Sequence, residues 1–187
     1  MPTIAVDPAP EILTKRLCLR FSRMDDLDRL VELIGNIDVA RYLARVPYPY
    51  SRQDGEDFIR ATMNGVTRDG ELIYAIADRT DDSLIGACGL ILGGDAVELG
   101  YWVGAPYWRR GFAREAVTAL IDLAFGPLGL RGIYADVAIE NQPSRALLAA
   151  LGFQQTGKVP VYQMVERRSV AGVRFELEPD HWKGAHW

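Results

Sequence analysis

The sequence is poor in the residues that build disulfide frameworks and metal centres. Its 187 residues include two cysteines, Cys18 and Cys88, and two histidines, His181 and His186. Both cysteines lie in apolar stretches, which is typical of buried free thiols rather than of a disulfide. Both histidines lie in a polar tail without the further ligands that a zinc site needs. We therefore expect no disulfide and no metal.

Positive charge and long hydrophobic runs are also scarce. Lys and Arg number 21 against 25 Asp and Glu, which gives a formal net charge of -4. Proteins that coat nucleic acids or bind membrane surfaces usually carry a basic excess, so we expect no nucleic-acid and no membrane partner. No apolar run approaches the roughly 18 residues of a membrane span. The opening MPTIAVDPAPE lacks the basic and apolar segments of a signal peptide, and we expect a cytoplasmic protein.

What is present is the composition of a single globular domain. Hydrophobic residues make up 49% of the chain and charged residues 25%, both ordinary for a soluble protein with its own core. Neither an internal repeat nor a linker divides the chain. We expect one domain over residues 13–182, with terminal extensions at 1–12 and 183–187. Trp182 and Trp187 in the tail are either packed or exposed, so a monomer and a homodimer both stay open.

The hydrophobic periodicity predicts a mixed α/β fold, in the order strand, two helices, three strands, helix, strand, helix, two strands. Ser51 and Asp54 have the spacing of a capping box, and Pro143 suits the first turn of a helix. Apolar residues three or four apart predict helices over 24–34, 51–66, 112–125 and 143–152, with a short helical piece at 37–43. Short apolar or alternating runs predict strands over 17–21, 72–77, 84–92, 97–103, 133–139, 158–167 and 172–178, with a hairpin connection at 93–95.

One basic stretch stands out in this acidic chain. WRRGFAREA, residues 108–116, places three arginines and one glycine where a helical pattern begins. A helix N-terminus has free N–H groups and a partial positive charge, and a glycine there lets an anion approach the backbone. The stretch matches neither a Walker loop nor a G-x-G-x-x-G fingerprint. The residues alone leave two interpretations open, a solvent-exposed basic helix start and a backbone cradle for a phosphorylated ligand.

Four segments, in the same order along the chain, resemble segments of the GNAT N-acetyltransferase superfamily. Within that superfamily they are most similar to the branch of ribosomal-protein N-terminal acetyltransferases. Residues 108–116 resemble its coenzyme A loop, Gln/Arg-x-x-Gly-x-Gly/Ala, with Gly111 and Ala113 in place but Trp108 at the first position. The other segments are TKRLCLR at 14–20, ELGYWV at 98–103, and NQPS at 141–144 with LGF at 151–153. The resemblance covers nearly the whole chain.

This resemblance implies acetyl-CoA as acyl donor and a sheet whose fourth and fifth strands splay apart around it. It implies that backbone groups around Trp102 and Val103 pair with the pantetheine arm, and that amides of the 110–114 segment hold the pyrophosphate. The expected cofactor-binding residues are Trp102, Val103, Arg109, Arg110, Gly111, Phe112, Ala113, Arg114 and Asn141.

The resemblance also suggests catalytic residues. Glu98 is the general-base candidate, because it is the only carboxylate in its apolar strand and partial burial would raise its pKa; the alternative is a salt-bridged or solvent-facing carboxylate. Many relatives place a tyrosine as general acid where this chain has Leu148, which has no proton to give. Ser144 is the candidate to hydrogen-bond the leaving sulfur, and a simple helix-start serine is the alternative.

The acceptor is a primary amine, either a protein N-terminus or a small molecule, and neither its identity nor the acyl length can be read from the sequence. Tyr48 and Tyr50, in a stiff aromatic-proline loop, and Tyr162 on a late strand are the candidate substrate-binding residues. Two rival functions stay open. Because Leu148 replaces the tyrosine, the chain can be a catalytically weak coenzyme A-binding sensor or regulatory module. It can also be a domain that oligomerises through exposed strands.

Overall fold

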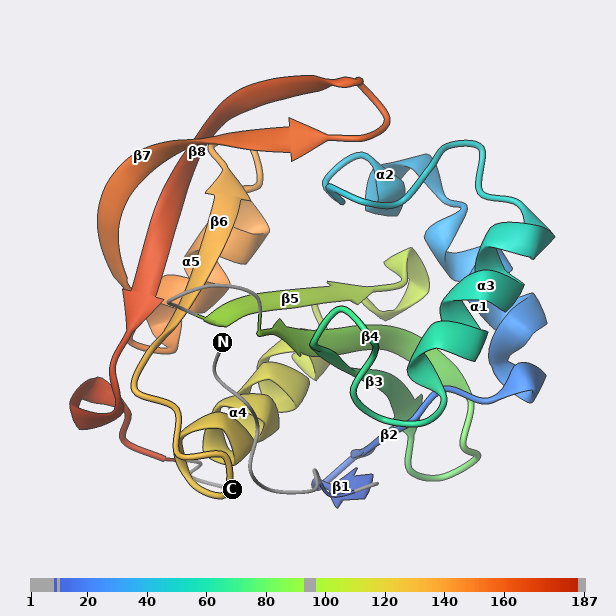
Figure 1. The fold of residues 1–187 in the computed structure, drawn as a ribbon, viewed down its shortest axis with the longest axis horizontal. Helices are drawn as coiled ribbons and strands as arrows, with labels where there is room; N and C mark the ends of the chain where they lie inside the picture. Colours follow the sequence, from blue (N-terminus) through green and yellow to red (C-terminus); the bar gives the residue numbers. More distant parts are fainter. Residues whose placement is uncertain (1–8, 10, 93–96, 185–187) are drawn as a thin grey trace.

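Eight strands form one mixed sheet with helices on both faces, in a computed structural model that describes residues 9, 11–92 and 97–184 (Figure 1). The strand order in the sheet is β1-β2-β3-β4-β5-β6-β8-β7. The strands are β1 (Glu11–Leu13), β2 (Leu17–Arg20), β3 (Glu71–Asp78), β4 (Leu84–Ile91), β5 (Val97–Val103), β6 (Ile133–Ala138), β7 (Gln154–Gln163) and β8 (Arg168–Leu177). The helices are α1 (Leu27–Ile34), α2 (Ile37–Ala40), α3 (Arg52–Thr62), α4 (Phe112–Phe125) and α5 (Gln142–Ala150).

The predicted α/β fold and its element order are confirmed, and the differences lie at the ends of elements. The short edge strand β1 was not predicted, because three residues carry too little periodicity to register. Helix α3 begins at the predicted capping box but ends at Thr62 rather than at 66. Strands β7 and β8 start four residues earlier than expected, at Gln154 and Arg168. The predicted connection at 93–95 lies outside the described residues.

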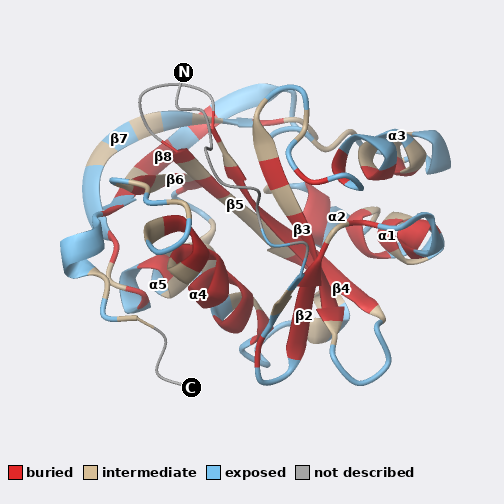
Figure 2. Ribbon diagram, turned by 60° about the horizontal axis from the view of Figure 1, so that its bottom comes forward, coloured by how far each residue is buried: buried red, intermediate tan, exposed pale blue. Residues whose placement is uncertain are grey.

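Two hydrophobic cores lie on opposite faces of the sheet. Helices α4 and α5 pack on one face, where the larger core includes Leu120, Leu148 and Phe175. Helices α1 and α3 pack on the other face, where a smaller core forms around Leu30 and Ile59. Figure 2 shows the buried residues along the strands and on the inner sides of these helices. Sheet and helices together therefore leave little space except where the sheet itself opens.

The sheet opens between β5 and β6, which run parallel. β5 pairs with β4 from Glu98, which lies opposite Ile91, to Val103, which lies opposite Gly86. With β6 it makes only two pairs, Val97 opposite Ile133 and Glu98 opposite Tyr134. Beyond Glu98 the two strands separate, and β6 continues its pairing with β8 on the far side. This confirms the predicted splay of the two central strands and leaves one backbone edge of each without a strand partner.

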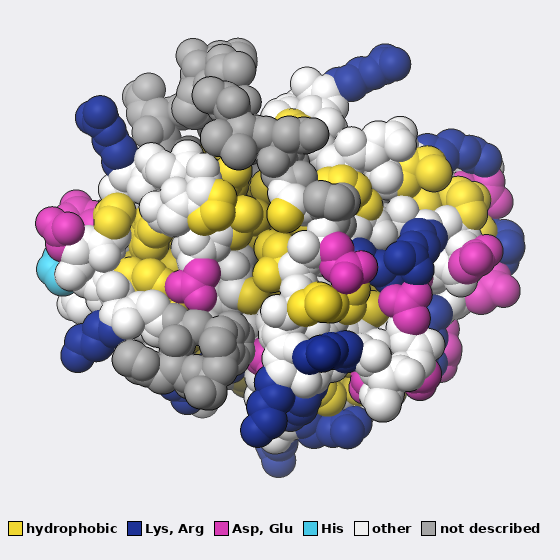
Figure 3. Space-filling model, turned by 90° about the horizontal axis from the view of Figure 1, so that it is seen from below, with side chains coloured by type: hydrophobic (Ala, Val, Ile, Leu, Met, Phe, Trp, Pro, Cys, Tyr) yellow, Lys and Arg dark blue, Asp and Glu magenta, His cyan; other side chains and the backbone are white. Residues whose placement is uncertain are grey.

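The cysteines and Trp182 have defined places in this fold. Cys18 and Cys88 are both buried free thiols, as predicted. Trp182 packs against the larger core, and its indole Nε1 donates to Asp122 Oδ1 on α4 at 2.7 Å, whereas Trp187 lies outside the described residues. None of the described helices has the length and apolarity that a membrane-spanning helix needs. The face shown in Figure 3 carries side chains of both charge signs around hydrophobic ones.

Two glycines on β4 and β5 test this packing. A Cβ at Gly86 would overlap the Trp102 carbonyl oxygen and lie 2.9 Å from Val103 Cα, whereas a Cβ at Gly100 would meet no atom within 4 Å. We expect Gly86→Ala to lower the free energy of unfolding by about 1–3 kcal/mol, because β4 and β5 would be forced apart. Gly100→Ala should change it by less than about 0.5 kcal/mol. Urea unfolding measures both, and equal losses would contradict an open space beside Gly100.

Candidate active site

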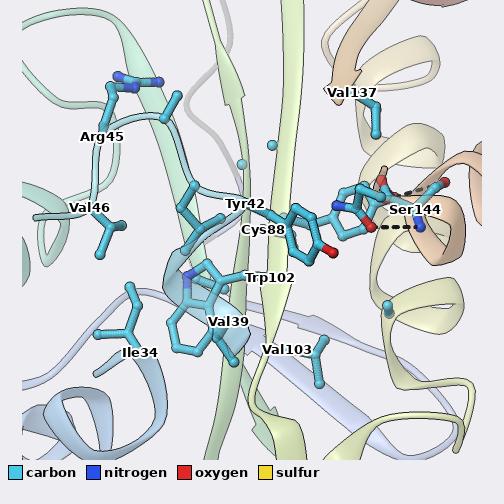
Figure 4. Close-up of a pocket in the computed structure, with 18 of the residues that line it drawn as sticks. Ile34, Val39, Tyr42, Arg45, Val46, Cys88, Trp102, Val103, Val137 and Ser144 are labelled. Atoms are coloured by element: carbon cyan, nitrogen blue, oxygen red, sulfur yellow. Dashed lines mark hydrogen bonds between the residues drawn. The ribbon is translucent and has the colours of Figure 1, made fainter. Parts of the chain in front are cut away.

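The gap between β5 and β6 is part of a large cavity of about 1130 Å³. Its walls are the residues 99–103 of β5 and 135–138 of β6, the loop after α2, the start of α4, and the first turn of α5. Figure 4 shows the contributions from both sheet faces: Trp102 lies near Ile34 and Val39, while Ser144 and Val137 lie on the opposite side. The cavity therefore has walls on both faces of the sheet.

The start of α4 forms a backbone cradle at one end of this cavity. Gly111, the residue before the helix, has a φ of 78°, and Arg109 has a φ of 59°, so two residues of the loop adopt the left-handed region. The amides of Phe112, Ala113 and Arg114 pair with no acceptor among the residues the structure describes. A helix start with free amides and a partial positive charge binds anions. The geometry therefore fits a pyrophosphate.

The cradle is braced by a residue that the sequence analysis did not single out. The Arg16 guanidinium donates to the Arg110 carbonyl oxygen at 2.8 Å and lies over the Phe112 ring at 4.5 Å. It also pairs with the buried carboxylate of Glu115, at 2.7 Å. Glu115 accepts two more bonds, from Thr14 Oγ1 and from the Arg16 amide, both at 2.7 Å. Arg16 thereby ties the β1–β2 turn to the loop before α4.

The electrostatics of this brace favour a charged Glu115. Burial opposes ionisation, but the bonds from Thr14 and Arg16 outweigh it and lower the pKa of the Glu115 carboxyl. The ionised carboxylate is therefore the stable form at neutral pH, and it holds the Arg16 side chain beside Gly111, where a Cβ would lie 3.4 Å from Arg16 Nη2. The only signal in the sequence is that Thr14 and Arg16 belong to the segment resembling the family's start.

The predicted arginines of the loop do not all point the same way. Arg109 and Arg114 line the cavity. Arg110 does not, because its guanidinium lies over the rings of Phe112 and Tyr107, at 4.9 and 6.0 Å. The Arg110 side chain is thus directed at these rings, while the Arg110 backbone is part of the loop before α4.

The Trp108 that replaces the family's Gln or Arg has a structural role. Its indole Nε1 donates to the Val103 carbonyl oxygen at 2.6 Å, which fixes the loop to the end of β5. The Trp102 side chain packs against the smaller core, on the α1–α3 face. Gly104 donates its N–H to the Ile85 carbonyl on β4, so Val103, the residue before it, turns its backbone groups toward β6, and Trp102 turns its own toward β4.

Glu98 lies where the two strands separate, with its side chain partly buried. Burial raises the pKa of the Glu98 carboxyl, and this is the largest effect. The positive charges of Arg45 and Arg174 lower that pKa, and the negative charges of Asp136 and Glu71 raise it. The net result is a raised pKa. Arg45 pairs with Glu71, and Arg174 makes two bonds to Asp136, at 2.6 and 2.8 Å. Among the described residues Glu98 has no ion pair, so the salt-bridged alternative is not what the structure places there.

The first turn of α5 gathers the other predicted residues. Asn141 caps the helix, with its Oδ1 accepting from the Ser144 amide at 3.2 Å. Ser144 lines the cavity, and its Oγ lies 2.8 Å from the hydroxyl oxygen of Tyr101 on β5. Leu148 is fully buried in the larger core. A tyrosine hydroxyl does reach this end of the cavity, but from β5 rather than from position 148, and the sequence analysis missed it.

The candidate acceptor residues separate into two groups. Tyr50 and Tyr162 line the cavity from the loop before α3 and from β7. Tyr48 is not among the lining residues, and 43% of its surface is exposed. The structure therefore leaves Tyr50 and Tyr162 as cavity walls and places Tyr48 on the rim of the molecule.

A split sheet with a cavity in its gap and an anion cradle at a helix start are the features of a site for an extended phosphorylated ligand. The sequence model of the acetyltransferase (GNAT) domain family matches residues 16–154. The chain belongs to this family and is an acetyl-CoA-dependent acetyltransferase.

Individual relatives agree with this assignment. The chain is 32% identical over 177 residues to the uncharacterized N-acetyltransferase p20 of Bacillus licheniformis, covering 92% of this chain and 98% of that protein. A Vibrio cholerae structure, provisionally a ribosomal-protein-serine acetyltransferase, superposes with a TM-score of 0.76 at 29% identity, covering 93% of this chain and all of that one. The fold also matches the microcin C7 self-immunity acetyltransferase MccE in complex with acetyl-CoA and AMP, with a TM-score of 0.76 at 19% identity over 88% and 93% of the chains.

The brace predicts a binding defect far from any catalytic group. Arg16→Ala removes the bond to the Arg110 carbonyl and the contact with Phe112, so the loop loses its fixed shape. We expect the Kd of acetyl-CoA to rise about tenfold, equivalent to about 1.4 kcal/mol. Isothermal titration calorimetry measures the Kd. The control is Arg23→Ala, which removes an exposed arginine paired with Asp82 away from the cavity. An unchanged Kd for Arg16→Ala would show that the cradle keeps its shape without the brace.

Proposed function

We propose that the protein transfers the acetyl group by direct attack of a primary amine on the thioester, with Glu98 as general base and Ser144 beside the leaving sulfur. The observation that carries this proposal is the separation of β5 from β6 beyond Glu98, with the α4 cradle at one end of the gap. An extended ligand can pair with the free edge of β5 while its pyrophosphate meets the free amides of α4. Its reactive end then lies between the two faces of the sheet.

The alternation of side chains along β5 assigns the two faces different tasks. Successive residues of a strand point to opposite faces. Trp102 packs against the α1–α3 core and Tyr101 against the α4–α5 core, so Glu98 shares the face of Trp102. The base therefore lies on the side where Tyr50 and the loop after α2 bound the cavity. The leaving sulfur would lie on the side of Ser144.

The open space at Gly100 supports an amine approach between these residues. It lies between Glu98 and Trp102 on the same strand face, and no atom lies within 4 Å of where its Cβ would be. A primary amine with a short stem can pass there and place its nitrogen beside the Glu98 carboxylate. General base catalysis needs the neutral amine, whose lone pair attacks the carbonyl carbon.

The acceptor class we propose is an α-amine of a protein N-terminus or a small molecule of comparable basicity. A lysine with a pKa of about 10.4 costs roughly 4–5 kcal/mol to deprotonate at pH 7, whereas an α-amine near pKa 8 costs about 1 kcal/mol. One carboxylate without a strongly basic partner suits the smaller demand. A structural relative at 17% identity, from Vibrio fischeri, is named a ribosomal-protein-S5-alanine acetyltransferase, so a protein is the acceptor in its name.

The alternative of a coenzyme A sensor is not favoured. It rested on Leu148, and the structure supplies a hydroxyl pair, Ser144 with Tyr101, at the same end of the cavity. The buried free thiols and the use of acetyl-CoA support our prediction of a cytoplasmic enzyme. A homodimer stays a prediction that size-exclusion chromatography with light scattering would test.

Activity and its pH dependence test the role of Glu98. Release of free coenzyme A, followed with a thiol reagent over a panel of α-amine peptides, lysine peptides and small amines, should be fastest with α-amines. Glu98→Gln should lower kcat/KM by about 10²–10⁴ at pH 7. Below the pKa of Glu98 the wild-type logarithm of kcat/KM should fall with a slope of about two, and that of Glu98→Gln with a slope of about one, since only the amine still titrates. Identical profiles would remove Glu98 from the mechanism.

The carboxylates of Glu98 and Glu115 should have opposite effects on stability. The folded-state pKa of Glu98 lies above its unfolded value, so the unfolded chain ionises first and the free energy of unfolding falls as the pH rises through that range. Glu98→Gln should therefore raise the Tm at pH 8. The folded-state pKa of Glu115 is lowered, so its contribution is present at neutral pH and lost as the pH falls through the folded pKa. Glu115→Gln should lower the Tm at pH 8, as scanning calorimetry would show; a Tm loss for Glu98→Gln would instead indicate a structural carboxylate.

A further inference from the structure

Two hydroxyl groups meet at the sulfur side of the cavity, from elements far apart in the sequence. Tyr101 on β5 and Ser144 on the first turn of α5 place Oη and Oγ 2.8 Å apart, a normal distance for a hydroxyl–hydroxyl hydrogen bond. Both residues line the cavity. Figure 4 shows Ser144 with the dashed lines that end on it, opposite Trp102. Either oxygen can be the donor, and the direction of this bond decides what Ser144 can do.

The oxygens near the Tyr101 hydroxyl favour one direction. Burial raises the pKa of Tyr101 to about 12, against an opposing contribution from the Ser144 bond, so the phenol keeps its proton at neutral pH. That hydrogen has two oxygens within reach. Ser144 Oγ lies at 2.8 Å, whereas the Ser144 carbonyl oxygen lies at 3.5 Å, too far for a strong bond. Since both oxygens near it belong to Ser144, the Tyr101 hydroxyl is taken as the donor to Ser144 Oγ.

We infer that Tyr101 is a positioning residue that turns Ser144 into a directed hydrogen-bond donor for the leaving thiolate. A hydroxyl has one hydrogen and two acceptor lone pairs. Once Ser144 Oγ accepts from Tyr101, its own hydrogen must point elsewhere, and Tyr101 Oη is the one side-chain partner of Oγ among the described residues. The free direction is the cavity. This inference rests on the proposed function, because it needs a sulfur beside Ser144.

The first turn of α5 fixes the backbone position of Ser144. The Asn141 side chain caps α5 by accepting from the Ser144 amide, so the Ser144 backbone is held while its hydroxyl is turned by Tyr101. Donation from the phenol also polarises the serine O–H and strengthens it as a donor. The Ser144 hydroxyl and the Glu98 carboxylate lie on opposite faces of β5. The base acts on the nucleophile from one side and the hydroxyl pair on the leaving group from the other.

The step balances without a net proton donor in the protein. The amine nitrogen forms a bond to the acetyl carbon and gives its extra proton to the Glu98 carboxylate. The carbon–sulfur bond breaks, and its electron pair leaves on sulfur as a thiolate that accepts a hydrogen bond from Ser144. The serine keeps its proton, and the thiolate is protonated by water after release. Preorganised donors of this kind act by stabilising developing charge.

A double-mutant cycle tests the inference on the full-length chain, with the amine that the wild-type enzyme acetylates fastest. Ser144→Ala should lower kcat by about 10²-fold, as loss of one such donor does. Tyr101→Phe should lower kcat about three- to tenfold, because an unguided serine hydroxyl occupies the productive one of its staggered positions only about a third of the time. The KM for acetyl-CoA should change less than about twofold in both. The double variant should be no slower than Ser144→Ala, because Tyr101 acts only through Ser144.

Tyr74→Phe is the matched control, because it removes another buried hydroxyl, which donates to the Ala9 carbonyl at 2.7 Å and belongs to a residue of the larger core that does not line the cavity. It should lower the Tm as much as Tyr101→Phe without changing kcat. Full wild-type kcat in Tyr101→Phe, or a double variant slowed by the product of the two single effects, would overturn the inference. A wild-type enzyme that releases no coenzyme A with any amine would instead overturn the proposed function, so the two failures are distinguishable.

Discussion

The site depends on one feature of the sheet: the pairing between β5 and β6 ends after two residue pairs. β5 and β6 share only two residue pairs before they separate, although each continues in the sheet through its other neighbour. Backbone N–H and C=O groups without partners are costly unless solvent or a ligand satisfies them. The open edges of β5 and β6 therefore both create the cavity and give it polar groups for an extended ligand. The two cores on either side keep the gap from closing.

The anion cradle is the second part of the site, and its shape is maintained by electrostatics away from the ligand. Gly111 adopts the left-handed backbone region without strain, whereas Arg109 holds it only when its surroundings enforce it. The Arg16 bond to the Arg110 carbonyl and the buried Glu115 carboxylate supply that constraint. An acidic protein can in this way keep a local positive site, because the charge comes from helix amides as much as from arginines.

Much of the fold and part of the site could be predicted from the sequence. Helix α3 and strand β5 carry clear caps or apolar periods, and Gly111 stands in a local motif, so neighbouring residues suffice to find them. Tyr101 and Arg16 could not be found in this way. Tyr101 meets Ser144 only because β5 lies beside α5 across the open sheet, and Arg16 meets Arg110 only through the pairing of distant turns. Local spacing also does not show that the Arg110 side chain lies over the Phe112 ring.

The most direct test of this account is an amide NMR titration of the isotope-labelled protein with acetyl-CoA. The account predicts that the largest shifts fall on the amides of residues 111–114 and of 99–103, the cradle and the free edge of β5, while β2 and β3 stay unchanged. Shifts confined to other elements, or none at millimolar acetyl-CoA, would contradict the claim that the divergence of β5 and β6 is the acyl-donor site.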